Sequence, residues 1–190
     1  MTRIGIIIGS TRPGRNGEQV AQWVRETAAA RGDAEFELID LLDHRLPHLD
    51  EPYPAMSGQY EHEHTKAWRD RITQFDGFVI VTPEYNGSTT GVLKTALDFL
   101  YAEWNNKAVG LVSYGFSGGN RAADYLRLVC GTLQMAVAGP QVMLPLATEF
   151  EGNTVFKPSA RSAAMLDALL NQVVGWSTAL VAVRAVPAAA

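Results

Sequence analysis

Short apolar runs that end abruptly at turn residues constrain the fold of this chain more than any other feature of its sequence. Residues 4–8, 78–81 and 108–112 are such runs, and each is followed by a loop rich in Gly, Ser or Pro and then by a helical pattern. A buried parallel strand has this appearance, because helices cover both of its faces. The alternation of strands and helices predicts a parallel sheet with helices on both sides.

The remaining apolar patterns complete this α/β arrangement. Further strands are expected at 36–39 and 142–146, and helices from residue 18 to the Arg31-Gly32 pair, from Thr65 to Phe75, over 91–100, up to Gly131, and over 159–183. Five strands joined in this way match the flavodoxin-like, doubly wound order 2-1-3-4-5. We expect a single domain over residues 1–184 and a frayed tail at 185–190. Residues 41–64 contain three prolines and no steady period, and their role stays open.

Composition limits the partners and the cellular compartment that such a chain suggests. A formal net charge of −4 over 190 residues gives no general attraction to nucleic acid or to anionic membranes. The first residues enter a strand without the pattern of a signal peptide, and no apolar run approaches the roughly 20 residues that span a bilayer. Cys130 is the only cysteine, so no intrachain disulfide or thiolate cluster forms. We therefore expect a soluble cytoplasmic protein.

The loop after the first strand has the composition of a phosphate site. Its candidate ligands precede the N-terminus of a helix, where free N–H groups and partial positive charge favour anions, and they are Ser10, Thr11, Arg12, Arg15, Asn16 and Gly17. Two guanidinium groups and two hydroxyls favour a dianionic phosphate over a carboxylate. The loop matches neither the P-loop nor the GxGxxG pattern, so a monophosphate fits better. An ordinary glycine-rich turn with solvated arginines remains the alternative.

Two more loops follow strands three and four, which neighbour strand one in the expected order. Their candidate ligand-binding residues are Pro83, Glu84, Tyr85, Asn86, Gly87 and Ser88, and then Ser113, Tyr114, Gly115, Phe116, Ser117, Gly118 and Gly119. Open parallel sheets bind ligands where the strand order reverses, at the carboxyl ends of these strands. Facing loops with aromatics and glycines suit a flat heterocycle, and beside a monophosphate this suggests FMN. Two tight turns whose aromatics cap the core are the alternative.

Three segments resemble one known family. GSTRPGRNG at 9–17, TPEYNGSTTGVLKTALDFL at 82–100 and SYGFSGGNRAA at 113–123 are similar to the NADPH-dependent FMN reductases, a flavodoxin-like family that includes quinone, azo-dye and chromate reductases. The resemblance runs from residue 4 to about residue 176. Asn16 stands where the family often has Ser or Val, and Thr89-Thr90 where Ile-Pro is frequent.

This resemblance implies how a cofactor binds. It implies noncovalent FMN, with NADPH or NADH as co-substrate, its phosphate on residues 10–17 and its ring between residues 83–88 and 113–119. N–H groups around Asn86 then meet the N5/O4 edge of the flavin, and those of residues 114–117 meet the N1/C2 edge. No catalytic side chain is implied, because the flavin N5 carries the hydride. Tyr85 and Tyr114 are expected to limit the space above the ring.

The leading functional hypothesis is an FMN-dependent NAD(P)H oxidoreductase with a small acceptor, which is a quinone, an azo compound, a metal oxyanion or free flavin. The alternatives are a flavodoxin-type electron carrier with a protein partner and a nucleotide- or phosphosugar-binding protein without flavin. A homodimer or dimer of dimers is expected, because a shallow site leaves one ring face uncovered. Tyr101, Trp104 and the long segment 41–64 are candidates for that interface.

Two patterns suggest other chemistry on first inspection. His62-Glu63-His64 resembles a metal-binding tract, but no third ligand follows at a suitable spacing, so no metal site is expected. Residues 115–119 match the letters GxSxG around Ser117. A hydrolase triad of that kind needs a later His, and the last histidine in the chain is His64.

Overall fold

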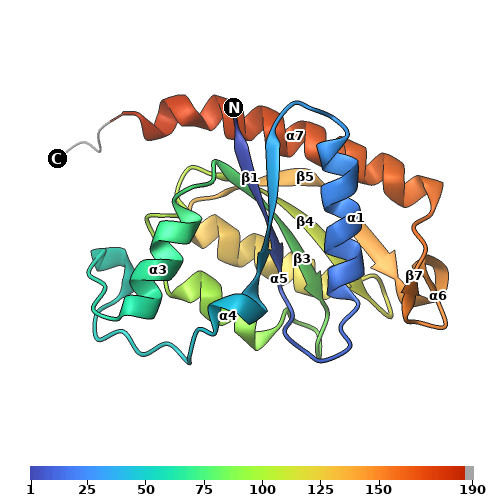
Figure 1. Ribbon diagram of the computed structural model, residues 1–190, viewed down its shortest axis with the longest axis horizontal. Helices are drawn as coiled ribbons and strands as arrows, with labels where there is room; N and C mark the ends of the chain where they lie inside the picture. Colours follow the sequence, from blue (N-terminus) through green and yellow to red (C-terminus); the bar gives the residue numbers. More distant parts are fainter. Residues whose placement is uncertain (187–190) are drawn as a thin grey trace.

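The sheet has the predicted topology. The computed structural model describes residues 1–186, and its five parallel strands lie in the order β2-β1-β3-β4-β5 (Figure 1). The strands are β1 (Arg3–Ile8), β2 (Glu35–Asp40), β3 (Gly77–Pro83), β4 (Ala108–Gly115) and β5 (Ala136–Pro145). All seven residues of β3 are buried, as expected for a central strand covered on both faces.

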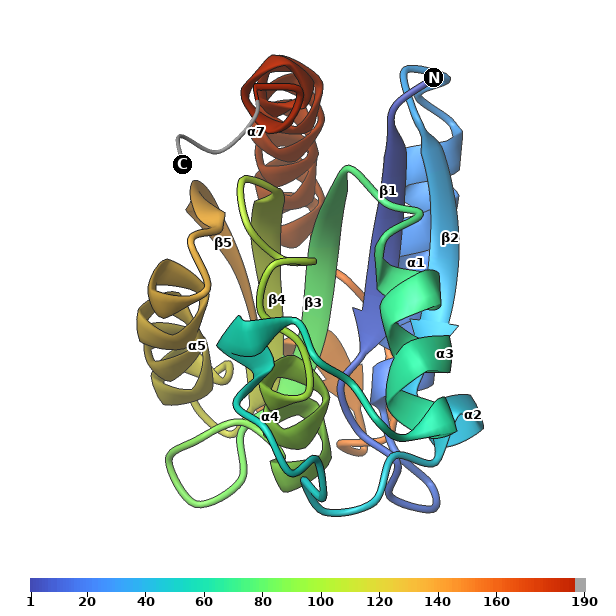
Figure 2. The same ribbon diagram turned by 90° about the vertical axis from the view of Figure 1, so that its left-hand side faces the viewer.

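Helices cover both faces of the sheet. One face carries α1 (Gly17–Ala29) and α7 (Ala160–Arg184), and the other carries α3 (Glu63–Ile72), α4 (Gly91–Asp98) and α5 (Asn120–Thr132) (Figure 2). Each face has its own apolar core: Val20 and Leu169 belong to the first, Trp68 and Leu97 to the second. The flavodoxin-like fold class is therefore confirmed.

Five short elements were not expected from the sequence. Segment 41–64 contains α2 (Leu41–His44) and a 3₁₀ turn, η1 (Ala55–Ser57), and β5 is followed by α6 (Leu146–Glu149) and the hairpin of β6 (Phe150–Glu151) and β7 (Val155–Phe156). Each is at most four residues long, too short for a periodic pattern.

Several predicted boundaries were wrong. Helix α3 begins at Glu63 with His62 as its N-cap, so Thr65 lies inside the helix, fully buried, instead of capping it. It also ends at Ile72, three residues before Phe75. Strand β5 starts six residues before the predicted one, because it is an edge strand with a weak apolar pattern and an irregular register opposite residues 109–111. Of the predicted frayed tail, residues 187–190 lie outside the described chain.

The length and composition of helix α7 are those of a possible membrane span. Among the described residues it is the one helix that meets this criterion, whereas no such span was expected from the sequence. One third of its most apolar stretch is buried, and α7 packs against β3, β4 and β5. A core helix of a soluble protein meets the same criterion.

The three loops of interest meet at one edge of the sheet. The Gly9 N–H donates to the Val81 carbonyl at 2.8 Å, which joins the first loop to β3. The Glu84 N–H donates to the Tyr114 carbonyl at 3.0 Å, which joins the second loop to β4. In Figure 1 this edge is the lower one, where β1 and β3 end.

Candidate functional site

A cavity of about 220 Å³ opens where the three loops meet. Its lining consists of Arg12, Arg15, Asn16, Pro83, Glu84, Tyr85, Tyr114, Gly115, Phe116 and Leu146. All of these except Leu146 are among the residues predicted from the sequence. Three loops distant in the sequence thus line one cavity, as expected at the carboxyl ends of neighbouring parallel strands.

A second cavity of about 520 Å³ adjoins the first. It is lined by Glu84, Tyr85, Asn86, Gly87, Phe116, Ser117 and Arg121, so three residues belong to both cavities. At their junction Tyr85 is 38% exposed and Phe116 is 88% exposed. These two side chains are the aromatic surfaces that a planar ligand meets first.

The two arginines of the first loop have different surroundings. The Arg15 guanidinium donates to Asp40 at 2.5 and 3.0 Å, to Glu18 at 2.6 and 3.0 Å, and also to the Ser10 carbonyl. Burial alone would lower the pKa of Arg15, but the hydrogen bonds to Glu18 and Asp40 outweigh it and raise that pKa. With its side chain only 4% exposed, Arg15 ties the loop to the end of β2 and is not a solvated arginine.

Arg12, by contrast, is exposed, and no carboxylate among residues 1–186 lies within ion-pair distance of it. Its backbone N–H approaches the Ser10 hydroxyl at 3.4 Å, and that hydroxyl lies 3.2 Å from the Tyr85 hydroxyl. Ser10 is almost fully buried, while Thr11 is half-buried. Arg12 is therefore the cation of this loop with its charge free for a ligand.

Backbone donors point to the chemistry of the ligand. No backbone carbonyl among residues 1–186 accepts a hydrogen bond from the N–H groups of Thr11, Asn16 or Glu18. At the second cavity the same holds, within the described chain, for Asn86, Gly87, Phe116 and Ser117. Unpaired donors at a helix N-terminus suit a phosphate, and unpaired donors in two facing loops suit the oxygen and nitrogen edges of a heterocycle. The residues present fit FMN.

Tyr114 has a different position from the one expected. It is only 6% exposed, its ring packs 6.3 Å from Phe150, and its hydroxyl lies against Gly17, where an added Cβ would come within 2.9 Å of it. Burial is the main cause that raises the pKa of the Tyr114 phenol, which stays neutral. Tyr114 thus supports the first turn of α1, and Tyr85 and Phe116 are the exposed aromatics.

The other predicted residues shape the loops. The Ser113 hydroxyl donates to the Gly118 carbonyl at 2.8 Å, and Gly119 has φ +76° with no room for a Cβ beside Ser113. Tyr85 and Ser88 pair through two backbone hydrogen bonds that close a tight turn over Asn86 and Gly87. Neither Ser88 nor the Ser113, Gly118 and Gly119 group lines either cavity.

Three residues in or beside the two cavities were not predicted from the sequence, namely Arg121, Leu146 and Asp40. Arg121 lines the second cavity, its side chain is 77% exposed, and its backbone N–H donates to Glu84 at 3.1 Å. Its position directly after the third glycine loop was the available signal. Leu146 and Asp40 carried no such signal, because their roles depend on how β5 and β2 end in space.

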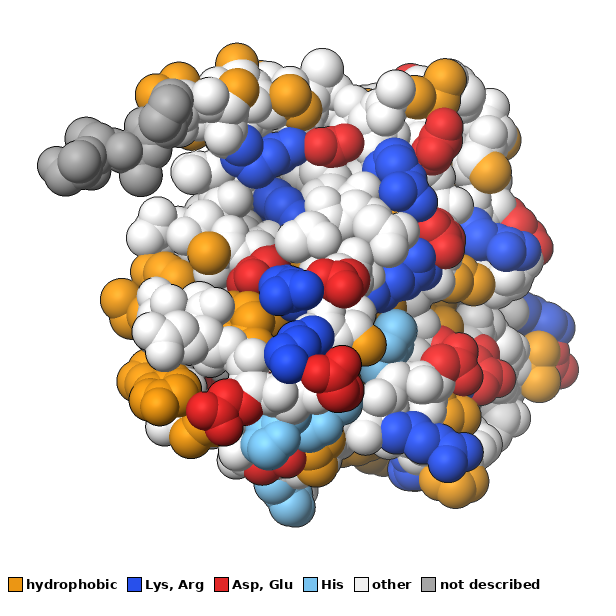
Figure 3. Space-filling model, turned by 60° about the vertical axis from the view of Figure 1, so that its left-hand side comes forward, with side chains coloured by type: hydrophobic (Ala, Val, Ile, Leu, Met, Phe, Trp, Pro, Cys, Tyr) orange, Lys and Arg blue, Asp and Glu red, His pale blue; other side chains and the backbone are white. Residues whose placement is uncertain are grey.

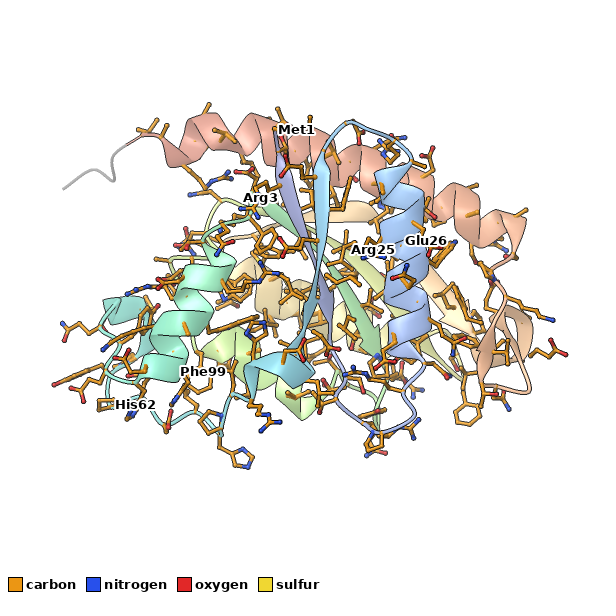
Figure 4. All side chains as sticks on the ribbon, viewed as in Figure 1. Met1, Arg3, Arg25, Glu26, His62 and Phe99 are labelled. Atoms are coloured by element: carbon orange, nitrogen blue, oxygen red, sulfur yellow. The ribbon has the colours of Figure 1, made fainter. Side chains whose placement is uncertain are left out.

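The histidine tract lies elsewhere. The His62 ring donates from Nε2 to the Asp50 carbonyl at 3.1 Å, and the His64 ring contacts the Asp50 carboxylate at 3.0 Å. The two imidazole rings stack with their centroids 5.2 Å apart. Figure 4 shows His62 and Phe99 near the start of α3, away from the loop between β1 and α1. Figure 3 shows histidine side chains near the lower edge of the face it displays and a separate histidine patch higher on the same face. Among residues 1–186 no group of three potential ligands is placed to hold a metal ion.

Comparison with known proteins identifies the family. Residues 2–149 match the family model described as NADPH-dependent FMN reductase. An NAD(P)H-dependent FMN reductase of Schizosaccharomyces pombe is 44% identical over 147 residues, which cover 75% of this chain and 74% of that protein. A 2-hydroxy-1,4-benzoquinone reductase of a Burkholderia species is 31% identical, covering 71% of this chain and 73% of its own.

Solved structures agree on the fold. The flavoenzyme NAD(P)H:(acceptor) oxidoreductase of Paracoccus denitrificans superposes with a TM-score of 0.72 at 20% identity, covering 94% of this chain and 98% of its own. The family match spans all three loops of the site. The chain therefore belongs to the NADPH-dependent FMN reductase family.

Proposed function

We propose that this chain is an FMN-dependent oxidoreductase that takes electrons from NADPH or NADH and passes them to a small acceptor. The observation that supports this most directly is the pair of adjoining cavities. One ends at Arg12 and the unpaired N–H groups of α1, and the other is bordered by the unpaired N–H groups of Asn86, Gly87, Phe116 and Ser117. A phosphate at one end and a flat heteroatom-bearing ring at the other match this division.

The residues have distinct tasks in this proposal. Arg12, with the N–H groups of Thr11 and Asn16, would hold the phosphate, while Arg15 fixes the loop that presents them. Tyr85 and Phe116 would border the ring, and the turn at Asn86-Gly87 would meet one of its edges. Donors preset at a site where negative charge develops stabilise that charge without reorganisation. N–H groups of Phe116 and Ser117 would have this role.

The bound FMN would supply the redox chemistry, by accepting a hydride from nicotinamide and passing electrons to the acceptor. The chain's own contribution is then binding, orientation and charge stabilisation. Its lone thiol supports this division, because Cys130 is fully buried and burial raises its pKa to about 12, so it is no nucleophile. Ser117 lies on an exposed loop with no histidine partner among the described residues.

We propose that the acceptor binds at the second cavity. It opens to solvent beside Tyr85 and Phe116, and Arg121 is the cation on its lining. A flat, electron-poor molecule suits this arrangement, and a quinone is the first choice because a quinone reductase is among the relatives. Azo compounds, metal oxyanions and free flavin remain acceptors to test.

We also propose a cytoplasmic homodimer or dimer of dimers. Trp104 does not contribute to such an interface, because it is fully buried in its own core, where its indole donates to the Leu97 carbonyl. Segment 41–58 supports it better, since four of its apolar side chains are 47–73% exposed, namely Leu42, Leu49, Tyr53 and Met56. Exposed apolar side chains gathered on one segment are candidates for an interface.

Steady-state kinetics with a panel of acceptors test the function. FMN-loaded protein is mixed with NADPH or NADH and, separately, a benzoquinone, an azo dye, chromate and free FMN. We expect nicotinamide oxidation with at least one small acceptor, fastest with the quinone, and none when apoprotein is assayed with the acceptors other than free FMN. Oxidation that requires an added electron-carrier protein, and no small acceptor, would contradict the proposal.

A further inference from the structure

The β6–β7 hairpin packs against the first turn of α1, beside the proposed phosphate site. Gly152 and Asn153 have φ of +59° and +60°, and the Thr154 N–H donates to the Glu151 carbonyl at 3.2 Å. Two consecutive left-handed residues form a tight two-residue turn of the kind that matches the twist of a hairpin. Figure 1 shows this hairpin next to the lower end of α1.

Side chains of α1 hold the backbone of the hairpin through three hydrogen bonds. The Asn16 amide donates to the Asn153 carbonyl at 2.9 Å. The Gln19 amide donates to the Thr154 carbonyl at 2.8 Å and accepts from the Phe156 N–H at 3.0 Å. Trp23 adds an edge-to-face contact with Phe156, with ring centroids 5.3 Å apart. The hairpin is therefore attached along two turns of the helix.

These contacts change the role of Asn16. An Asn at the N-cap usually accepts a hydrogen bond from an N–H of the first helical turn. Here Asn16 is the N-cap of α1, but its backbone is already helical, with φ −74° and ψ −17°, and its side chain makes no capping hydrogen bond. The Glu18 N–H, which a capping side chain would take, has no backbone acceptor among residues 1–186.

The other strand of the hairpin reaches the same helix end. Phe150 packs against Tyr114, whose hydroxyl lies against Gly17. Strand β7 thus contacts α1 directly, and β6 reaches the first turn of α1 indirectly, through Tyr114 of β4.

We propose that the hairpin prevents Asn16 from capping α1, so that the N–H groups of the first turn stay free for the cofactor phosphate. Asn16 and Gln19 are then positioning residues, and Asn153 and Thr154 provide the backbone acceptors that hold them. This inference rests on the proposed function, which identifies the anion as the phosphate of FMN.

Substitution of Asn16 by Ser and by Ala separates capping from simple loss of a contact. Neither replacement reaches the Asn153 carbonyl, but Ser caps a helix and Ala does not. We expect Asn16→Ser to raise the Kd for FMN at least tenfold, and Asn16→Ala to raise it about threefold, a difference of about 0.7 kcal/mol. The Kd for riboflavin, which has no phosphate, should change less than twofold in both, and the Tm of the Asn16→Ser apoprotein should equal or exceed that of the wild type.

Gln19→Ala tests the attachment without altering the N-cap. Gln22→Ala is its matched control, because the one side-chain hydrogen bond of Gln22 within residues 1–186 is to Glu26 on the same helix. We expect Gln19→Ala to raise the FMN Kd about threefold to tenfold and Gln22→Ala to leave it unchanged. Equal losses in the Ser and Ala variants of Asn16, equal losses of FMN and riboflavin, or wild-type affinity in Gln19→Ala would each overturn the inference. Wild-type apoprotein that binds neither flavin would instead end the proposed function.

Discussion

Arg12 and Arg15 lie three residues apart in one loop, yet the structure surrounds them differently. Arg15 is buried against Asp40, whereas Arg12 is exposed. We expect Arg12→Ala to weaken FMN binding by about 1–3 kcal/mol, the range for a charge-assisted hydrogen bond, and to change stability by less than about 0.5 kcal/mol. We expect Arg15→Ala to weaken FMN binding as well and also to destabilise the apoprotein by about 1–3 kcal/mol, because Asp40 loses its partner.

Titration of each apoprotein with FMN and riboflavin, together with urea unfolding, measures both effects. If both variants keep the wild-type preference for FMN over riboflavin, the phosphate does not bind this loop.

Lys107 gives a prediction about pH. Its side chain is buried at the opposite edge of the sheet, where the ammonium group donates to the Ile72 carbonyl at 3.0 Å. Burial, and to a lesser degree Arg184, lowers the pKa of Lys107 to about 8. Between pH 8 and the unfolded pKa of about 10.5, the unfolded chain binds more protons than the folded protein does. The free energy of unfolding contributed by Lys107 therefore rises with pH in this range.

The comparison that isolates this effect is wild type against Lys107→Met. From pH 7 to pH 9.5 the unfolding free energy of the wild type should rise relative to the variant by roughly 1–2 kcal/mol. Parallel pH profiles in denaturant titrations would show that Lys107 has an ordinary pKa. Contributions from the ionisable groups that the two proteins share cancel in the difference.

At the level of residues, the sequence predicted which side chains meet but not how each one points. Nine of the ten residues lining the first cavity were expected, because glycine-rich loops after neighbouring strands had to converge. The sequence could not predict where the Tyr114 side chain points, because its position depends on Phe150. Phe150 lies in a hairpin whose strands are too short to give a sequence pattern. The pairing of Arg15 depends on Asp40, which is distant in sequence.

Among the elements, the turn between β3 and α4 is the one most sensitive to substitution. Asn86 and Gly87 have φ of +52° and +81°, and two hydrogen bonds between Tyr85 and Ser88 close the turn. A β-branched residue at φ +81° costs about 1–3 kcal/mol or forces the turn to another shape. The N–H groups at the second cavity would then move. We expect Gly87→Val to give folded protein that is colourless.

Gly91→Ala is the control for this turn, because the added Cβ meets nothing within 4 Å and the residue opens α4. It should stay yellow with wild-type FMN affinity. A yellow Gly87→Val with unchanged affinity would mean that the turn is not needed for the flavin.

Long elements were predicted well and short ones were not. The five strands and the helices of eight or more residues have recognisable apolar patterns, whereas α2 and α6 have only four residues each. The β6–β7 hairpin is held by a contact with Asn16, which is distant in the sequence. Thr90 shows the limit of local inference. It caps α4 through the Leu93 N–H and also donates to the Gly9 carbonyl, so it joins the first loop to the second, a contact that the sequence pattern does not reveal.

For the whole molecule, we propose one folding unit over residues 1–184 that assembles into a dimer. Sedimentation velocity at micromolar concentration should give at least a dimer. Met56, 73% exposed in segment 41–58, is the residue to change: Met56→Glu should shift the protein toward monomer and lower its NADPH oxidation. Leu128→Glu, an equally exposed position on α5, should do neither. A monomeric wild type with full activity would contradict the proposal.

The central claim is that the protein itself takes electrons from a nicotinamide and is not a carrier reduced by another protein. Anaerobic stopped-flow mixing of FMN-loaded protein with one equivalent of NADPH tests this most directly, with flavin absorbance near 450 nm as the signal. The account predicts that the flavin bleaches in a single turnover without any added protein and that later addition of a quinone restores the absorbance. A flavin that stays oxidised with both NADPH and NADH, and bleaches only when a separate reductase is added, would contradict the account.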